Sequence, residues 1–188
     1  MTQKEVEQLI EEFKVPKHVR RHCGAVAAVA GELAKKIQAS GEKVDIDLVL
    51  HSAALHDLVR VVDFKSFEPE VWDDLVTDEE IEFWKNLRKK YAGRHHADVA
   101  AEILRARGFP EEAQIVEQHK FIQIKKGFDS LEAKIVYYAD KRVRHDEIVS
   151  IAERLEDGRK RNAPETIGTA HAAELEKKVL ELEQELLG

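Results

Sequence analysis

The chain has 188 residues, 43% of them hydrophobic and 36% charged, with a formal net charge of −7. This length and composition fit one globular domain with a sizeable core, and the acidic balance argues against general nucleic-acid binding, although a local basic patch could still hold phosphates. No apolar run is long enough for a transmembrane helix, and the N-terminus lacks the apolar segment of a signal peptide. The single cysteine, Cys23, excludes an internal disulfide framework, so we expect a cytoplasmic location.

Hydrophobic periodicity predicts an all-α fold, beginning with two helices. The first is amphipathic, with apolar residues at i, i+3, i+4 and i+7, namely Val6, Leu9, Ile10 and Phe13. Pro16 suits the first turn of a second helix over about 17–39, which Gly41 ends. A third helix, capped by Asp45 or Asp47, is expected to continue through the mostly apolar stretch 50–60.

The middle of the chain is expected to contain an irregular loop followed by short helices. The helical pattern breaks after Arg60, and residues 61–76 mix apolar, acidic and aromatic side chains in a way that suggests a loop covering a site. The capping-box signature Thr77-Asp78-Glu79-Glu80 then predicts a helix that closes at Gly93. Two more helices are expected, over about 95–107 and 110–119, with a loop at 120–128.

The last third is predicted to hold three helices. Asp129-Ser130-Leu131-Glu132 resembles another capping box and starts a helix that ends near Arg142. A further helix is expected over about 146–155, ending near Gly158, and a basic linker follows it. The tail repeats apolar residues at spacings of four, three and four, at Leu175, Val179, Leu182 and Leu186. This stripe favours packing on the rest of the chain, with a dimerising coil as the alternative. We expect a helical bundle over 1–160, with its core at about 16–144, and a linker and amphipathic helix over 161–188.

Several ionisable residues fall on otherwise apolar helical faces, in five separate predicted helices. They are His22, His56, Asp57, His96, His119 and Asp140. A buried carboxylate is costly unless it is paired or bound to a metal, and helical bundles build metal sites from inward-facing side chains of several helices. Four such groups could hold one octahedral ion, and six, with Asp57 bridging, could hold two. The competing interpretation is a set of satisfied core and solvated histidines.

The arrangement resembles the HD-domain superfamily of metal-dependent phosphohydrolases. That pattern is a histidine, a later His-Asp pair and a distant aspartate, which match His22, His56-Asp57 and Asp140. The resemblance extends to His96-Ala97-Asp98-Val99, to His119 and to Tyr138-Ala139-Asp140-Lys141, and it covers about 16–144. The nearest resemblance is to the bacterial HD-domain diadenosine tetraphosphate hydrolases and to uncharacterised HD proteins.

The resemblance implies a divalent metal centre in the core of the bundle. His22, His56, Asp57 and Asp140 would bind one ion, and His96 and His119 a second, with Asp57 between them. The choice between His95 and His96 stays open, with His96 favoured. The ligand types suit Fe, Mn, Co, Ni, Mg or Zn without distinguishing them.

A bound divalent ion would supply hydroxide and neutralise phosphoryl oxygens, and nearby cations would stabilise the developing charge. With Asp57, we assign Arg60 and Lys141 to catalysis. Arg60 stands where relatives have lysine in His-Asp-x-x-Lys. Substrate contacts are predicted for Arg60, Lys120, Lys141, Arg144 and His18.

The predicted function is hydrolysis of a phosphoester or phosphoanhydride in a small phosphorylated molecule, with a nucleotide favoured. Two rival classes remain, because two-iron HD oxygenases use the same ligand types and a non-catalytic nucleotide or metal sensor could keep the same site. A homodimer formed through the C-terminal helix is the one protein partner that the sequence suggests, and no membrane association is expected.

Overall fold

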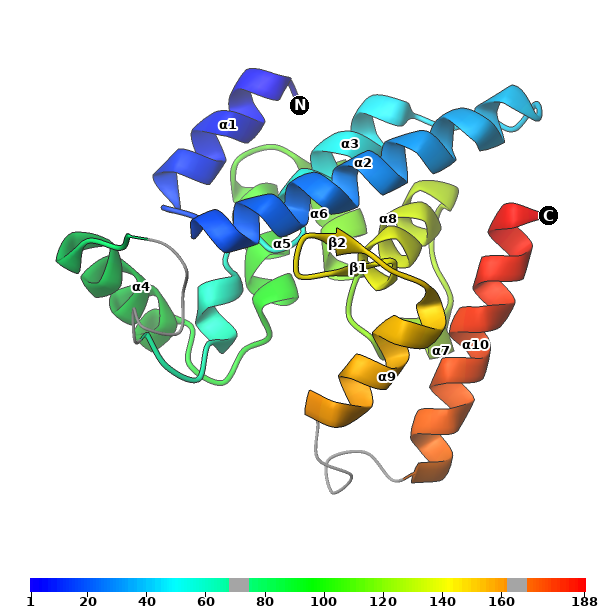
Figure 1. Cartoon of the computed structure of the whole chain (residues 1–188). Helices are drawn as coiled ribbons and strands as arrows, with labels where there is room; N and C mark the ends of the chain where they lie inside the picture. Colours follow the sequence, from blue (N-terminus) through cyan, green and yellow to red (C-terminus); the bar gives the residue numbers. More distant parts are fainter. Residues whose placement is uncertain (68–74, 162–168) are drawn as a thin grey trace.

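The computed structural model of the chain describes residues 1–67, 75–161 and 169–188, and it confirms the all-α prediction (Figure 1). Within these ranges, β-structure is limited to one hairpin of two short strands. The elements in chain order are α1 Gln3–Glu12, α2 Lys17–Ala39, α3 Ile46–Leu55, the 3-10 helix η1 Arg60–Asp63, α4 Asp78–Lys90, α5 His96–Ala106, α6 Pro110–Glu117, α7 Gln123–Lys126, α8 Leu131–Lys141, β1 Val143–Arg144, β2 Glu147–Ile148, α9 Ile151–Arg161 and α10 Thr169–Leu187.

Local capping signals place several helix starts where the sequence predicts them. The side chain of Asp45 accepts a hydrogen bond from the backbone N–H of Leu48 and caps α3, and Thr77 forms the predicted capping box at α4. Ser130 caps α8, but the predicted box does not close there. Glu132 instead accepts a hydrogen bond from the backbone N–H of Asp45, at 3.1 Å, and so links the starts of α3 and α8.

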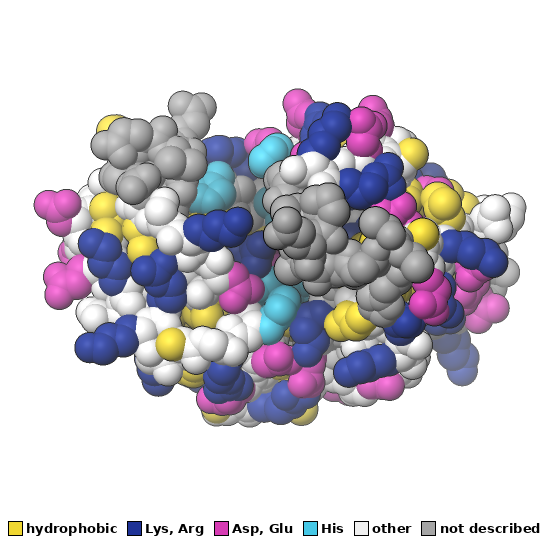
Figure 2. Space-filling model, turned by 90° about the horizontal axis from the view of Figure 1, so that it is seen from below, with side chains coloured by type: hydrophobic (Ala, Val, Ile, Leu, Met, Phe, Trp, Pro, Cys, Tyr) yellow, Lys and Arg dark blue, Asp and Glu magenta, His cyan; other side chains and the backbone are white. Residues whose placement is uncertain are grey.

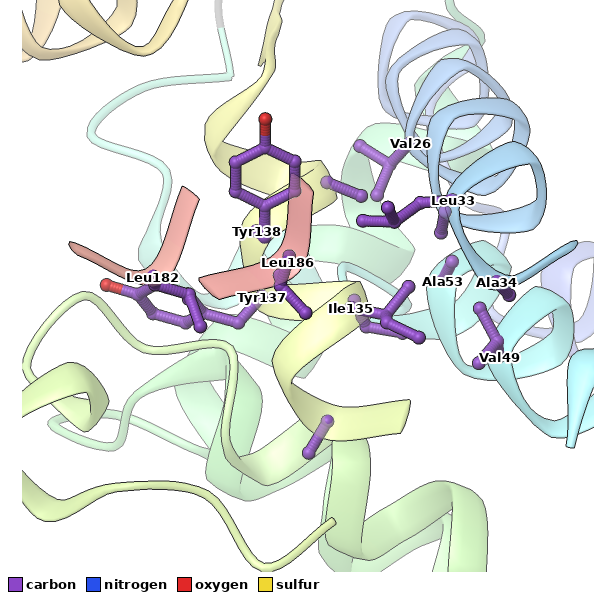
Figure 3. Close-up of a cluster of buried hydrophobic side chains, with 14 of the residues drawn as sticks. Val26, Leu33, Ala34, Val49, Ala53, Ile135, Tyr137, Tyr138, Leu182 and Leu186 are labelled. Atoms are coloured by element: carbon purple, nitrogen blue, oxygen red, sulfur yellow. The ribbon is translucent and has the colours of Figure 1, made fainter. Parts of the chain in front are cut away.

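The core is built around α2, which crosses the molecule and packs against α3 and α8. Figure 3 shows part of the larger apolar cluster, to which α2 contributes Val26 and Leu33, α3 contributes Val49, and α8 contributes Ile135. A second cluster joins α1 to the first half of α2, the end of α3, and helices α5 and α6. The polar site is formed by residues of α2, α5 and α8 and by residues that directly follow α3 and α6.

The C-terminal helix packs on the bundle. Its predicted stripe is buried, at Leu175, Val179, Leu182 and Leu186. Val179, Leu182 and Leu186 belong to the larger apolar cluster, and α10 contacts α7 and α8. The stripe is therefore covered within the chain, and dimerisation through this helix stays a prediction.

Several predicted boundaries are wrong. The third helix ends at Leu55, because the chain turns into i to i+3 hydrogen bonds there, so the His-Asp pair lies after the helix. The predicted loop 120–128 contains the short helix α7, and the hairpin β1–β2 replaces the start of the helix expected at 146. That helix begins at Ile151 and continues past Gly158, so the first residues of the predicted basic linker belong to α9.

Two predicted segments lie partly outside the described residues. The expected loop 61–76 begins with η1, and its residues 68–74, which include Trp72, are not described. The same holds for residues 162–168 of the predicted linker. Within the described ranges, no helix combines the length and the apolar character needed to cross a membrane.

Candidate metal centre

The fold brings the predicted ligand residues together from five separate parts of the chain. His22 comes from α2, His96 from the first turn of α5, and Asp140 from α8. The His56-Asp57 pair and His119 follow the C-terminal ends of α3 and α6. Two groups of potential ligand atoms result, each with all its atoms within 4.8 Å of one another: His22, His56 and Asp140, and Asp57, His96 and His119.

The first group is centred on Asp140. The Nε2 atom of His22 lies 3.1 Å from Asp140 Oδ1, and the Nε2 atom of His56 lies 3.7 Å from the same oxygen. His56 Nε2 is also 3.8 Å from Asp57 Oδ2. Asp57 therefore connects the first group to the second.

The second group is centred on Asp57. Its Oδ1 atom lies 2.9 Å from His96 Nε2 and 3.5 Å from His119 Nε2. The two Nε2 atoms are themselves 2.9 Å apart. The two oxygens of Asp57 thus face different histidines, as the predicted bridging position requires.

Backbone carbonyls fix the orientation of three of these imidazole rings. The Nδ1–H groups of His56 and His119 donate to the carbonyls of Ala53 and Val116, at 2.7 and 2.6 Å. His22 Nδ1–H donates to the carbonyl of His145, at 2.6 Å. His145 has a left-handed backbone (φ of 58°) in the turn between β1 and β2, so the hairpin supplies this acceptor.

This hydrogen bonding determines which ring nitrogen can bind a metal. A neutral imidazole that donates through Nδ1–H carries its lone pair on Nε2, and in all three rings Nε2 points to the carboxylates. Among the residues that the structure describes, no hydrogen-bond partner is present for the buried Nε2 atom of His56. Inward lone pairs beside two carboxylates need a cation, so the residues present fit a divalent ion.

The protonation states support the same donor set. Burial lowers the pKa of His56 to about 4, so its ring is neutral near pH 7. Burial alone would raise the pKa of Asp57 and of Asp140, but the neighbouring histidines and Lys141 outweigh it and hold both carboxyl groups well below their usual pKa. Neutral imidazoles and ionised carboxylates are suitable ligands for divalent transition metals.

Two of the predicted cations contact ligand residues directly. The Nη1 atom of Arg60 lies 3.1 Å from Asp63 Oδ2 and 2.8 Å from His96 Nδ1, and its Nε lies 3.7 Å from Asp57. The ammonium group of Lys141 is buried, donates to Asp140 Oδ2, and also donates to the carbonyl of His119 at 3.3 Å. Lys141 is therefore placed to support a ligand.

The other predicted substrate contacts are more dispersed. Lys120 forms an ion pair with Asp98, and Arg144 on the hairpin pairs with Glu147 at 3.0 Å. His18 stacks on Phe64, with ring centroids 5.8 Å apart.

The structure separates the two adjacent histidines. His95 is the N-cap of α5, where its Nδ1 accepts a hydrogen bond from the backbone N–H of Ala97 at 3.1 Å. It precedes the helix, whereas the sequence places it in the first turn. His96 is buried and directs Nε2 to Asp57, which favours His96 as the ligand.

Sequence reasoning missed the carboxylate of Asp63, which forms a hydrogen bond with His96 Nδ1. The available signal was its position three residues after Arg60, which places both side chains on one turn of a helix. The carbonyls of Ala53, Val116 and His145 were also missed. Backbone groups at helix ends and turns leave no residue-type signature in the sequence.

Comparisons with known proteins relate most of the chain to one family model. A family model described as the HD domain matches residues 19–156, a segment that contains all the predicted ligand residues. An uncharacterised protein of Methanocaldococcus jannaschii, MJ0778, is 31% identical over 157 residues, which cover 73% of this chain and 76% of that protein. No solved structure gave a significant match.

Proposed function

Because the chain belongs to the HD domain family, whose members are generally metal-dependent phosphohydrolases, we propose that it hydrolyses a phosphoester or phosphoanhydride of a nucleotide. The observation that carries this proposal is the shared orientation of three imidazole rings. Three rings donate through Nδ1 to backbone carbonyls and present Nε2 to Asp57 or Asp140. This arrangement supports a one- or two-ion centre.

A divalent ion in this centre would lower the pKa of bound water and neutralise phosphoryl oxygens. We assign one ion to His22, His56, Asp57 and Asp140 and a second to Asp57, His96 and His119. The protein contributes two ionised carboxylates that offset part of the positive charge of the ions, and Asp57 has one oxygen near each group. Among the described cations, Arg60 is proposed to contact the substrate, because its guanidinium lies beside Asp57 and is 39% exposed.

Lys141 is proposed to act on the same reaction through Asp140. Its ammonium group is buried against that carboxylate and the ring of Tyr137, at 4.7 Å from the ring centroid. A cation held there keeps Asp140 ionised and oriented when an anionic substrate approaches.

Arg60 and Lys141 place positive charge beside Asp57 and Asp140, which supports an anionic substrate. Such local positive charge attracts phosphates even though the whole chain is acidic. On the face shown in Figure 2, histidine side chains lie among basic and acidic side chains. The resemblance to diadenosine tetraphosphate hydrolases makes dinucleoside polyphosphates the first compounds to test.

The test combines metal content with a hydrolysis screen. Wild type, Asp57→Asn and His56→Ala would be purified anaerobically, with Asp47→Asn as a control that removes an exposed carboxylate from α3. Bound metal would be quantified, and phosphate release would be measured with mononucleotides, dinucleoside polyphosphates and cyclic nucleotides in the presence of Mn, Fe or Co. Circular dichroism would establish that each variant is folded.

We expect metal-dependent phosphate release by wild type and the control, and its loss in both site variants. Wild type that stays metal-free and inactive after reconstitution would overturn the proposal. Bound iron without hydrolysis of any compound would favour the oxygenase class instead.

A further inference from the structure

We infer that Asp63 is a positioning residue that orients His96 toward Asp57. Asp63 lies in η1, and its Oδ2 atom forms a hydrogen bond with Nδ1 of His96. The same oxygen accepts the backbone N–H of His96, at 3.4 Å. The carboxylate therefore holds both the ring and the first helical residue of α5. This inference rests on the proposed metal centre, to which it adds a residue.

His96 differs from the other candidate ligand histidines in how its ring is held. His22, His56 and His119 each donate to a backbone carbonyl, whereas His96 Nδ1 faces the charged side chain of Asp63. A carboxylate behind a ligand histidine fixes the ring orientation and also raises the basicity of the inward nitrogen. A peptide carbonyl carries no net charge and has a weaker effect on basicity. The orientation of His96 thus depends on one replaceable side chain.

Arg60 links this pair to the bridging carboxylate. Its Nη1 atom lies 3.1 Å from Asp63 Oδ2, and its Nε lies 3.7 Å from Asp57 Oδ2. Arg60 and Asp63 occupy one short helix, which is anchored by the buried side chains of Val61 and Val62. The placement of Asp63 is therefore determined by packing as well as by charge.

A third metal position around Asp63 is a poorer explanation of the same contacts. Asp63, His95 and His96 do bring potential ligand atoms together. However, the guanidinium group of Arg60 already supplies a positive charge within this group. His95 also uses Nδ1 to cap α5. Orientation of His96 accounts for the contacts of Asp63 with the ring and the backbone of His96 without another ion.

The test measures metal binding by Asp63→Ala and Asp63→Asn. Alanine removes the acceptor, whereas asparagine keeps an oxygen acceptor and removes the charge. The matched control is Glu102→Gln, which neutralises a carboxylate on α5 that is 53% exposed and pairs with Arg94. Metal-free proteins would be titrated with Co²⁺, with calorimetry giving the affinity of each ion and visible absorption reporting its coordination. Thermal unfolding of the metal-free proteins would report the effect of each substitution on the fold.

We expect wild type and the control to bind two ions. Asp63→Ala should lower the affinity for one of the two ions roughly 10- to 100-fold and alter the Co²⁺ spectrum of that ion. Asp63→Asn should lower this affinity less, and neither variant should change the affinity for the other ion. Two ions bound with wild-type affinity by both variants would overturn the role of Asp63 while leaving the proposed centre in place. Equal weakening of both ions together with a lower melting temperature of the metal-free protein would overturn it in favour of a structural role. A wild type that binds at most one ion would overturn both this inference and the two-ion form of the proposed function.

Discussion

Replacing Lys141 with methionine tests whether its ammonium group supports Asp140. Both side chains are only 10% exposed, so each charge depends on the other for compensation. Breaking a buried ion pair by removing one partner costs roughly 3–5 kcal/mol, because the remaining charge stays buried. We expect a value near ~3 kcal/mol, at the lower end of this range, because a protonated His22 can still donate from Nε2 to Asp140 at 3.1 Å. Burial lowers the pKa of His22, but Asp140 and Asp57 outweigh that effect and raise it.

The assay is urea unfolding of the metal-free protein, followed by circular dichroism. The matched control is Lys134→Met on the same helix, which removes an ion pair with Glu185 at the surface, where the loss should be at most about 1 kcal/mol. For a chain of this size, about 3 kcal/mol corresponds to a melting temperature lower by roughly 6–12 °C. Added Mn²⁺ should reduce the deficit of Lys141→Met, since an ion bound at Asp140 replaces part of the lost positive charge.

Equal stability of the Lys141→Met and Lys134→Met proteins without metal would refute this reasoning. If such a stable variant also showed a raised KM for a phosphorylated substrate, the original prediction of a phosphate contact would be the better account of Lys141.

Three further outcomes follow from the site and the core. A metal concentration one hundred times Kd should stabilise the protein by about 2.7 kcal/mol and raise its melting temperature. A chelator should reverse this shift, and a shift that survives chelation would contradict reversible binding. Metal affinity should fall between pH 8 and pH 6. Burial lowers the pKa of His22 and His96, but neighbouring aspartates outweigh that effect and raise it, so protons compete with the ion as the pH decreases. A metal affinity that is independent of pH over this range would contradict that assignment. Leu182→Ala should lower the free energy of unfolding by roughly 2–5 kcal/mol, measured by chemical denaturation, because Leu182 is buried. Leu180→Ala, at a position 43% exposed, should change it by at most about 0.5 kcal/mol. Equal effects of the two substitutions would contradict the packing of α10.

The sequence predicted the helices whose signals are local. The bounds of α2 match the predicted range of 17–39, and the capping box at Thr77 starts α4 as expected. Each of these elements has strong periodicity or a cap made by neighbouring residues, and tertiary contacts reinforce the same pattern. The six candidate ligand residues were also predicted, from ionisable residues on apolar helical faces and from the HD pattern, whereas Asp63 was not.

Other features could not be read from local patterns. The helix predicted to carry the His-Asp pair ends at Leu55, although the apolar sequence continues beyond it. The β1–β2 hairpin packs on α2, where its turn supplies a hydrogen-bond acceptor to His22. The sequence favours Lys141 as a phosphate contact because it is a cation next to a ligand, and only the fold reveals its pairing with Asp140.

The early helix ends have a direct consequence for the site. His56 and His119 each follow a helix, and each donates Nδ1–H to the carbonyl three residues earlier, at Ala53 and Val116. Carbonyls in the last turn of a helix lack intrahelical partners, so the imidazole satisfies an acceptor while its other nitrogen turns to the carboxylates. The C-terminal end of a helix also carries partial negative charge, which favours a nearby cation. Ending α3 and α6 just before these histidines therefore orients two ligands and adds favourable electrostatics, whereas a continuous helix through His56 would provide neither.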